Sequence, residues 1–362
     1  MPLNTIAPIS IAELADVVAG SKLVLPHGAR TKPALSVLDA PGATRVDLTG
    51  LCGITDYQPS EFVISVLAGT PLTELRSTLA EHGHYLPFDP PLAAAGATVG
   101  GTVAAGLNGP CRLRYGGVRD FVIGARFIDG SGDEIKTGGK VIKNVAGFDF
   151  GKLLVGSFGR LAAIAELTFK VFPAPESYLS VCFELGHIEA SIAAAETLAG
   201  TALEPYAIDI EPPGRLHLRL GGTSSALSAT AARAEKMIDA PATRTSDDSE
   251  PAYWDEVRDH TWAKGDILVK VPTTSRELSD LDFAFGRIDA RRRYSLAGNV
   301  AHAALSAKQL PGMDTELDKL GLCGLVLWGN VTSARIGRRP SAEAEAAIKE
   351  ALDPSYKFLP LP

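Results

Sequence analysis

The apolar positions in the first 85 residues change from helical to extended spacing and back. Residues 10–20 place apolar side chains at helical spacing behind a capping box, which predicts a short amphipathic helix. Residues 23–25 and 62–67 are continuous apolar runs of the length of a strand. Residues 70–83 return to helical spacing, with a proline at the first helical position and a glycine at the end. We therefore expect helices and strands to be mixed in this part of the chain.

The pattern changes near residue 173, and we place the first domain boundary there. Before it, residues 121–129 and 134–137 predict a hairpin, and residues 161–171 predict a β-rich run that stops at two prolines. Beyond it, helical and strand patterns alternate. The predicted helices lie at 188–199 and 225–238, and the predicted strands at 216–220, 266–271, 293–304 and 322–330. This order predicts a second α+β domain, in which helices back one antiparallel sheet.

Length and charge narrow the class of protein. At about 150 residues per domain, 362 residues predict two lobes with substantial cores. We expect a first domain over 1–174, a second over 175–340, and a C-terminal segment, 341–362, that returns to the first. The formal net charge of −7 disfavours a nucleic-acid or anionic-membrane binder.

Targeting and metal signals are weak, and we expect a cytoplasmic protein. The first ten residues lack the basic and apolar segments of a signal peptide. The longest weakly polar run, residues 92–107, is shorter than the roughly 20 residues that a membrane helix needs. The four cysteines form no C-x-x-C pair, so we expect neither structural zinc nor an iron–sulfur cluster in this chain. His82 and His84 lack a third ligand nearby and are interpreted as surface residues.

Glycine is concentrated in one segment, because residues 96–159 hold 16 of the 36 glycines. In its densest part, Gly96–Gly106, backbone N–H groups free of neighbouring Cβ atoms are suited to an anion such as a pyrophosphate. The alternative is that these glycines mark strand bulges or tight contacts between a helix and a sheet. Neither G-x-G-x-x-G after the first strand nor a complete P-loop is present, which disfavours a Rossmann or kinase-like site.

Eight short motifs, taken in order and with their spacing, resemble the FAD-binding domain of the vanillyl-alcohol oxidase/p-cresol methylhydroxylase superfamily. They lie at residues 26–32, 46–48, 69–75, 83–90, 98–101, 116–120, 143–149 and 155–159. Segments 119–122 and 143–147 are most similar to the FAD-binding subunits of bacterial glycolate oxidases. The resemblance implies a two-subdomain FAD-binding domain of the p-cresol methylhydroxylase type, followed by a smaller α+β cap domain with an antiparallel sheet.

The resemblance also implies the cofactor and its contacts. Residues 27–31 would form a first loop against the FAD pyrophosphate, residues 98–102 a second loop, and the backbone of Ile164 would lie beside the adenine. The full set of implied FAD-binding residues is His27, Gly28, Ala29, Arg30, Thr31, Pro90, Thr98, Val99, Gly100, Gly101, Thr102, Gly106, Gly117, Val118, Asn144, Gly147, Gly159 and Ile164.

Two positions in the first loop depart from the family pattern. Arg30 stands where glycine is frequent, so the loop either avoids a positive φ there or bears the strain, and the charge of Arg30 is available to the pyrophosphate. Thr31 stands where some covalent flavoproteins of the superfamily carry histidine, which predicts non-covalent FAD. His27 is the alternative ring for a covalent bond, although it lies at a different place in the loop.

By resemblance, the chain is an FAD-binding subunit of a glycolate oxidase that oxidises glycolate to glyoxylate. Its implied partners are a larger flavin subunit and an iron–sulfur subunit that takes the electrons, and through them it would associate peripherally with the inner membrane. Two alternatives remain open: a self-sufficient dehydrogenase for another 2-hydroxy acid, such as D-lactate, and a non-catalytic FAD scaffold or electron relay. Flavin oxidation of a 2-hydroxy acid needs a cation for the carboxylate.

Arg258 is the candidate catalytic residue that would hold the carboxylate, and Arg293, on a predicted strand, is a further arginine of the second domain. The alternative for Arg258 is a place on the solvated, charged face of a helix, with Trp254 on the buried face.

Overall fold

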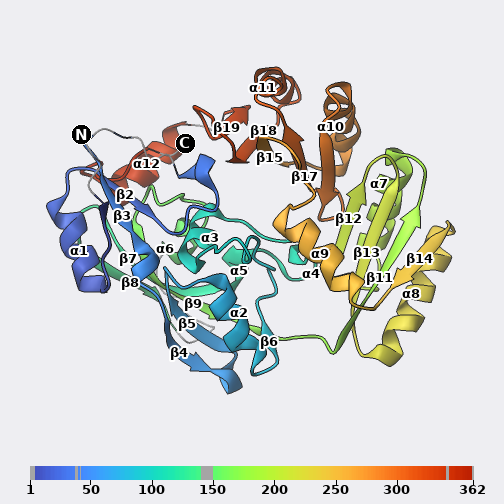
Figure 1. The fold of residues 1–362 in the computed structure, drawn as a ribbon, viewed down its shortest axis with the longest axis horizontal. Coiled ribbons are helices and arrows are strands. Elements are labelled where there is room, and N and C mark those ends of the chain that lie inside the picture. The colour runs from blue at the N-terminus through green and yellow to red at the C-terminus, as the bar shows by residue number, and fades with distance from the viewer. Residues whose placement is uncertain (1–4, 37–39, 41, 140–149, 340–341, 361–362) are drawn as a thin grey trace. The chain divides into compact units, whose positions relative to one another are not determined.

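The computed structural model describes residues 5–36, 40, 42–139, 150–339 and 342–360. The chain divides into two compact units (Figure 1). The first unit consists of Met1–Asn108, Gly116–Pro173 and Ser341–Pro362, and the second of Gly109–Tyr115 and Ala174–Pro340. The first unit is thus built from three separate stretches of the chain.

The first unit contains a parallel and an antiparallel sheet. The parallel sheet has the order β1-β3-β2 and contains β1 (Thr5–Ile6), β2 (Val24–His27) and β3 (Thr44–Asp47). The antiparallel sheet has the order β4-β5-β9-β7-β8 and contains β4 (Ile54–Gln58), β5 (Val63–Leu67), β7 (Val122–Ile128), β8 (Glu134–Gly138) and β9 (Ala163–Lys170). A short antiparallel pair joins β6 (His84–Tyr85) to β10 (Phe172–Pro173).

The first unit also contains short helices. They are α1 (Ile11–Gly20), α2 (Leu72–Ala80), α3 (Val99–Ala105), α5 (Val118–Phe121), α6 (Phe150–Leu154) and α12 (Ala342–Leu352). Of the capping box predicted for the first helix, the N-cap is present, since Ser10 Oγ accepts from Glu13 N at 3.2 Å, whereas Glu13 Oε2 accepts from Ile9 N, one residue before the cap, at 2.9 Å. The predicted hairpin is confirmed as the antiparallel pair of β7 and β8.

The second unit is a single nine-stranded sheet with helices packed on it, which confirms the predicted fold class. The strand order is β14-β11-β13-β12-β16-β17-β15-β18-β19, and every pair is antiparallel. Its strands are β11 (Ser177–Glu184), β12 (Ala207–Glu211), β13 (Arg215–Gly222), β14 (Ala242–Thr245), β15 (Ile267–Pro272), β16 (Arg291–Ser295), β17 (Val300–Leu305), β18 (Cys323–Trp328) and β19 (Arg335–Gly337).

The second unit also contains helices, several of which pack on its sheet (Figure 1). They are α4 (Arg112–Tyr115), α7 (Ile188–Ala199), α8 (Ser224–Ile238), α9 (Ser249–Asp259), α10 (Ser275–Arg287) and α11 (Leu310–Lys319). Helix α9 lies against β11, where Trp254 Nε1 donates to Ser180 Oγ at 2.8 Å. Trp254 is only 1% exposed, as expected for the buried side of this helix.

One predicted strand of the second unit is wrong in its extent. The run 293–304 is not one strand but a hairpin of β16 and β17, and the chain reverses between Ser295 and Val300. Leu296 and Ala297 adopt positive φ values of 59° and 56° in this turn. Gly298, with a φ of 86°, and Asn299 lie in the same turn, and they are the turn signal that the interpretation as one strand overlooked.

The C-terminal segment lies at the edge of β2. Val24 N donates to Lys357 O at 2.7 Å, and Val24 forms a parallel bridge with Phe358. The segment is held by Lys349 of α12, whose Nζ donates to Asp353 Oδ2 at 2.5 Å and to Phe358 O at 2.8 Å. This arrangement fixes the strand from which the first candidate cofactor loop begins.

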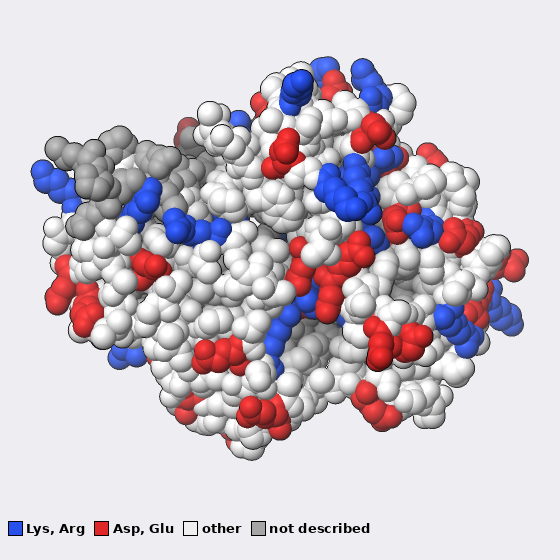
Figure 2. All heavy atoms as spheres, in the orientation of Figure 1, with Lys and Arg blue, Asp and Glu red and all other residues white. Residues whose placement is uncertain are grey.

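The surface carries both signs of charge. On the face shown in Figure 2, acidic and basic side chains of the described residues are interspersed rather than gathered into one basic surface. None of the helices within the described ranges is long and apolar enough to cross a membrane.

Candidate functional site

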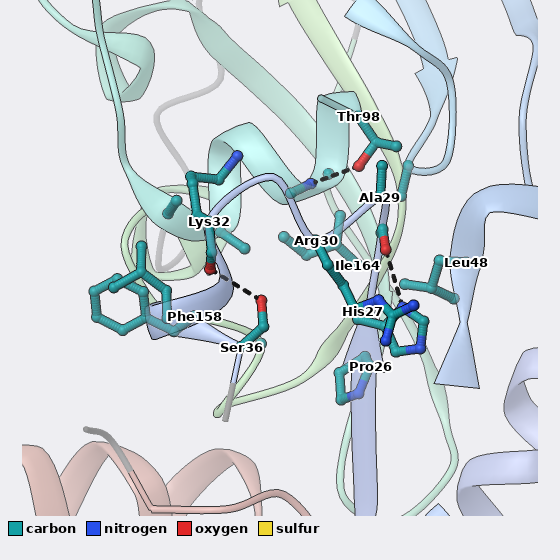
Figure 3. Close-up of a pocket in the computed structure, with 18 of the residues that line it drawn as sticks. Pro26, His27, Ala29, Arg30, Lys32, Ser36, Leu48, Thr98, Phe158 and Ile164 are labelled. Carbon is teal, nitrogen blue, oxygen red and sulfur yellow. Dashed lines mark hydrogen bonds between the residues drawn. The ribbon is translucent and has the colours of Figure 1, made fainter. Parts of the chain in front are cut away.

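A pocket in the first unit lies where three segments of the chain meet: the loop after β2, the start of α3, and the approach to β9 (Figure 3). The pocket has a volume of about 680 Å³, which includes space open to solvent and falls in the usual range for small-molecule sites. Its lining residues are Pro26, His27, Gly28, Ala29, Arg30, Thr31, Lys32, Leu35, Ser36, Leu48, Ala68, Thr98, Gly100, Gly101, Ala104, Ala105, Phe158, Gly159, Ala162 and Ile164.

The loop after β2 offers backbone donors to the pocket. Arg30 adopts a φ of 54°, so the loop bears the left-handed conformation that glycine would take more easily. In the part of the chain that the structure describes, the backbone N–H groups of Ala29, Arg30 and Thr31 have no hydrogen-bond partner. Successive free N–H groups around a left-handed residue form a concave nest for an anion.

The start of α3 forms the facing wall of the pocket. Thr98 caps this helix, since its Oγ1 accepts from Gly101 N at 3.3 Å (Figure 3). The two walls touch at Gly28, where an added Cβ would lie only 2.3 Å from Thr98 Oγ1. A Cβ on Gly100 would lie 2.7 Å from that of Ala68, and Gly100 N donates to Ala68 O at 2.8 Å. Gly28 and Gly100 are therefore needed for close packing of the pocket walls.

A buried lysine supplies positive charge at the same place. Lys32 lines the pocket and is only 7% exposed, and burial lowers the pKa of its ammonium group to about 8. Its Nζ donates to the neutral Thr31 Oγ1 at 2.9 Å, and it has no ion pair among the described residues. A diphosphate group would supply the missing negative charge, so Lys32 fits the phosphates of FAD.

Lys32 is not among the FAD-binding residues that the resemblance implies, although it lies at the end of the first loop motif. The available signal was its position between that loop and the apolar residues that follow. The short turn Pro33–Leu35 buries Ala34 and Leu35 and brings the lysine inward. Ser36 Oγ, which donates to Lys32 O at 3.4 Å, joins the two ends of this turn (Figure 3).

We expect Lys32→Met to weaken FAD binding by about one to two orders of magnitude at pH 7, since a hydrogen bond to a charged group contributes roughly 1.5–3 kcal/mol. A bound anion raises the lowered pKa of Lys32, so binding takes up a proton above pH 8. Wild-type affinity should therefore fall up to about tenfold between pH 8 and pH 9, and the Met variant should lose this dependence. Fluorescence titration of the flavin-free protein with FAD measures both effects. Lys22→Met, at an exposed lysine of the same unit, is the matched control; equal behaviour of the two variants would contradict the assignment.

The structure brings together many of the predicted cofactor residues. Those that line the pocket are His27, Gly28, Ala29, Arg30, Thr31, Thr98, Gly100, Gly101, Gly159 and Ile164. Those outside its lining are Pro90, Val99, Thr102, Gly106, Gly117 and Val118. Asn144 and Gly147 lie outside the described residues. Among the described residues, those that line the pocket come from the two predicted loops and from the approach to β9.

The predicted residues outside the lining have local roles. Gly106 ends α3 with a φ of 62°. Gly117 N donates to Asp120 Oδ2 at 2.8 Å, and Val118 N donates to Asn108 Oδ1 at 2.5 Å, so both residues fix the start of α5.

His27 is 8% exposed, and its ring is engaged within the protein. Nδ1 lies 2.9 Å from Gly28 O and 3.9 Å from a carboxylate oxygen of Asp47. This nitrogen already faces two oxygen acceptors, which disfavours the alternative of a covalent bond to flavin through it.

Arg258 of α9 is bound by carboxylates of its own helix. Its Nη1 donates to Asp255 Oδ1 at 2.6 Å, and its Nη2 donates to Asp259 Oδ2 at 2.8 Å. The guanidinium group is therefore already matched in charge, which favours the structural interpretation over a role in binding substrate. No group of three or more His, Cys, Asp or Glu side chains within the described ranges is arranged to hold a metal ion.

The pocket belongs to a flavin-binding protein. Residues 2–138 match the family model described as the FAD binding domain, which supports FAD as the cofactor. Over 144 residues the chain is 46% identical to glycolate oxidase subunit GlcE of Escherichia coli (strain K12), a match that covers 40% of this chain and 41% of that protein. It is 33% identical over 186 residues to D-lactate dehydrogenase of Anaerostipes hadrus, which covers 51% of this chain and 39% of that protein. The chain thus spans less than half the length of these curated relatives.

A solved structure supports the fold along nearly the whole chain. Alkyldihydroxyacetonephosphate synthase superposes with a TM-score of 0.72 over 98% of this chain and 75% of that one, at 15% sequence identity. The expected FAD-binding fold, with an antiparallel sheet in the second unit, is therefore confirmed.

Proposed function

We propose that this protein is the FAD-binding subunit of a glycolate oxidase, which oxidises glycolate to glyoxylate. The observation that carries the proposal is its 46% identity over 144 residues to a glycolate oxidase subunit. The pocket is consistent with it, because the nest after β2 and Lys32 provide a place for the cofactor's phosphates. When bound, FAD supplies the acceptor for the hydride that leaves the hydroxyl-bearing carbon.

In this proposal the electrons leave through a partner. The described residues hold no arrangement for a metal ion, and the four cysteines are far apart in the sequence. We propose that a larger flavin subunit and an iron–sulfur subunit complete the enzyme. The protein would then act in the cytoplasm and reach the inner membrane through these partners.

A second candidate is a self-sufficient dehydrogenase for D-lactate, favoured by the 33% identity to a D-lactate dehydrogenase. Anaerobic addition of glycolate or D-lactate to the FAD-loaded chain, alone and with its partner subunits, separates the candidates. Bleaching of the flavin absorbance by glycolate, completed or accelerated by the partners, supports the first. Rapid bleaching by D-lactate alone supports the second, and flavin that neither acid bleaches, even with the partners present, supports a non-catalytic scaffold.

We expect Arg258→Gln to leave the KM for glycolate within about twofold of the wild type, because its guanidinium is held by Asp255 and Asp259. Losing these partly exposed ion pairs should lower the free energy of unfolding by about 1 kcal/mol. Steady-state kinetics and chemical denaturation measure the two effects. A rise of tenfold or more in KM, with unchanged stability, would restore Arg258 as the residue that holds the substrate carboxylate.

A further inference from the structure

Helix α9 lies on the polar face of the second unit's sheet. In one half of this face, each buried arginine is paired with a carboxylate. On β13, Arg219 donates to both carboxylate oxygens of Glu250, at 2.9 and 3.0 Å. On β16, Arg293 lies 2.8 Å from the carboxylate of Asp209, which is fully buried. These cations already have carboxylate partners and do not need a ligand.

The neighbouring strands, β15 and β17, carry charge without such partners. Lys270 of β15 is the cross-strand partner of His302 of β17, so both side chains lie on the same face. The ring of His260, which ends α9, lies 4.4 Å from the His302 ring. Arg112 of α4 is close enough to Lys270 to help lower its pKa.

None of these four side chains has a hydrogen-bond or ion-pair partner within the described ranges. His260 is only 7% exposed, and its Nδ1 is buried without a partner there. A buried polar atom of this kind costs free energy unless a ligand or water satisfies it. The carboxylate nearest to this group along the chain, Asp259, is occupied by Arg258.

Burial and neighbouring charges lower the pKa values of Lys270, His260 and His302. Burial and Arg112 lower the pKa of Lys270 to about 8, burial lowers the pKa of His260 to about 4, and burial together with His260 and Lys270 holds the pKa of His302 well below its usual value. Near neutral pH the group therefore presents two cations beside two neutral imidazoles. Each neutral imidazole offers one donor and one acceptor nitrogen.

We infer that Lys270, Arg112, His260 and His302 form a binding site in the second unit for a small 2-hydroxy carboxylate. Lys270 and Arg112 donate to the carboxylate oxygens, and an imidazole nitrogen accepts from the neighbouring hydroxyl group. The identity of the ligand as the substrate rests on the proposed function. The existence of the anion site rests only on these four residues.

Calorimetric titration of the FAD-loaded full chain with oxalate tests the site, because oxalate is a two-carbon carboxylate with no C–H bond to oxidise. Lys270→Met should weaken oxalate binding by about tenfold or more, and Arg112→Gln by about threefold to tenfold, whereas Lys270→Arg should retain most of the affinity. Lys308→Met, at an exposed lysine of the same unit, should bind like the wild type. Histidine side-chain NMR should show shifts of two imidazoles on oxalate addition in the wild type.

Unchanged oxalate affinity in both Lys270→Met and Arg112→Gln would overturn the site. Arg112 is exposed, so its variant tests the site even if Lys270→Met fails to fold. Oxalate binding that depends on Lys270, in a protein that oxidises no 2-hydroxy acid, would refute the proposed function and keep the site. Normal glycolate oxidation with unchanged KM in both variants would keep the proposed function and refute the binding of the substrate at this site.

Discussion

The Gly28→Val variant is expected to fold and to be purified without flavin. A Cβ at this position would lie 2.3 Å from Thr98 Oγ1, and Thr98 is only 4% exposed, so it has little room to move. The loop after β2 and the start of α3 would have to separate, and both line the pocket. Overpacking of this kind costs about 3 kcal/mol, which weakens FAD binding by more than about a hundredfold. Flavin absorbance per chain after purification measures the loss.

A rescue variant identifies the cause. Gly28→Ala should also lose most of its FAD, whereas adding Thr98→Ala removes the oxygen that the new Cβ would meet and should restore binding to the level of Thr98→Ala alone. Gly20→Ala is the control, since a Cβ there meets no atom within 4 Å. Full flavin content in Gly28→Val would mean that the phosphates bind elsewhere.

Asp353→Asn is expected to lower the free energy of unfolding by about 3 kcal/mol or more. The Asp353 side chain is fully buried and pairs with Lys349, which is 5% exposed. It also accepts from the backbone N–H groups of Lys357 and Phe358, each at 2.8 Å. The substitution leaves a buried ammonium group without its counter-charge and loosens the segment at the edge of β2. Denaturation with urea measures the change.

The matched control is Asp16→Asn, at an exposed aspartate of α1 in the same unit, which should change stability by less than about 0.5 kcal/mol. Lys349→Met should also lower the free energy of unfolding by about 3 kcal/mol or more, because it leaves the fully buried Asp353 carboxylate without its counter-charge. Equal stability of Asp353→Asn and Asp16→Asn would show that the C-terminal segment does not support the first unit.

Local signals explain which elements were predictable from the sequence. The first helix was predicted correctly because its cap, Ser10 and Glu13, acts over three residues. The turn between β16 and β17 was missed although Gly298 and Asn299 lie in it, because the apolar residues on either side were interpreted as one continuous strand. The short strands β12 and β14 were also not predicted.

Part of the candidate site could also be predicted from the sequence, and part of it could not. Its two loops could be predicted because motif order and spacing are properties of the chain, whereas the importance of Lys32 depends on burial, which only the folded structure supplies. The glycines were explained either by anion binding to their backbone or by tight packing of a helix on a sheet, and these explanations do not exclude each other. Gly100 packs tightly against Ala68, and the same packing shapes the wall of the pocket.

The most direct test of this account is the flavin content of the purified wild-type chain after acid precipitation. We expect about one flavin per chain, released into the supernatant and identified as FAD by chromatography. This result would agree with an FAD site in the first unit and with non-covalent binding. A chain that cannot be reconstituted with FAD, or flavin that stays with the precipitated protein, would contradict it.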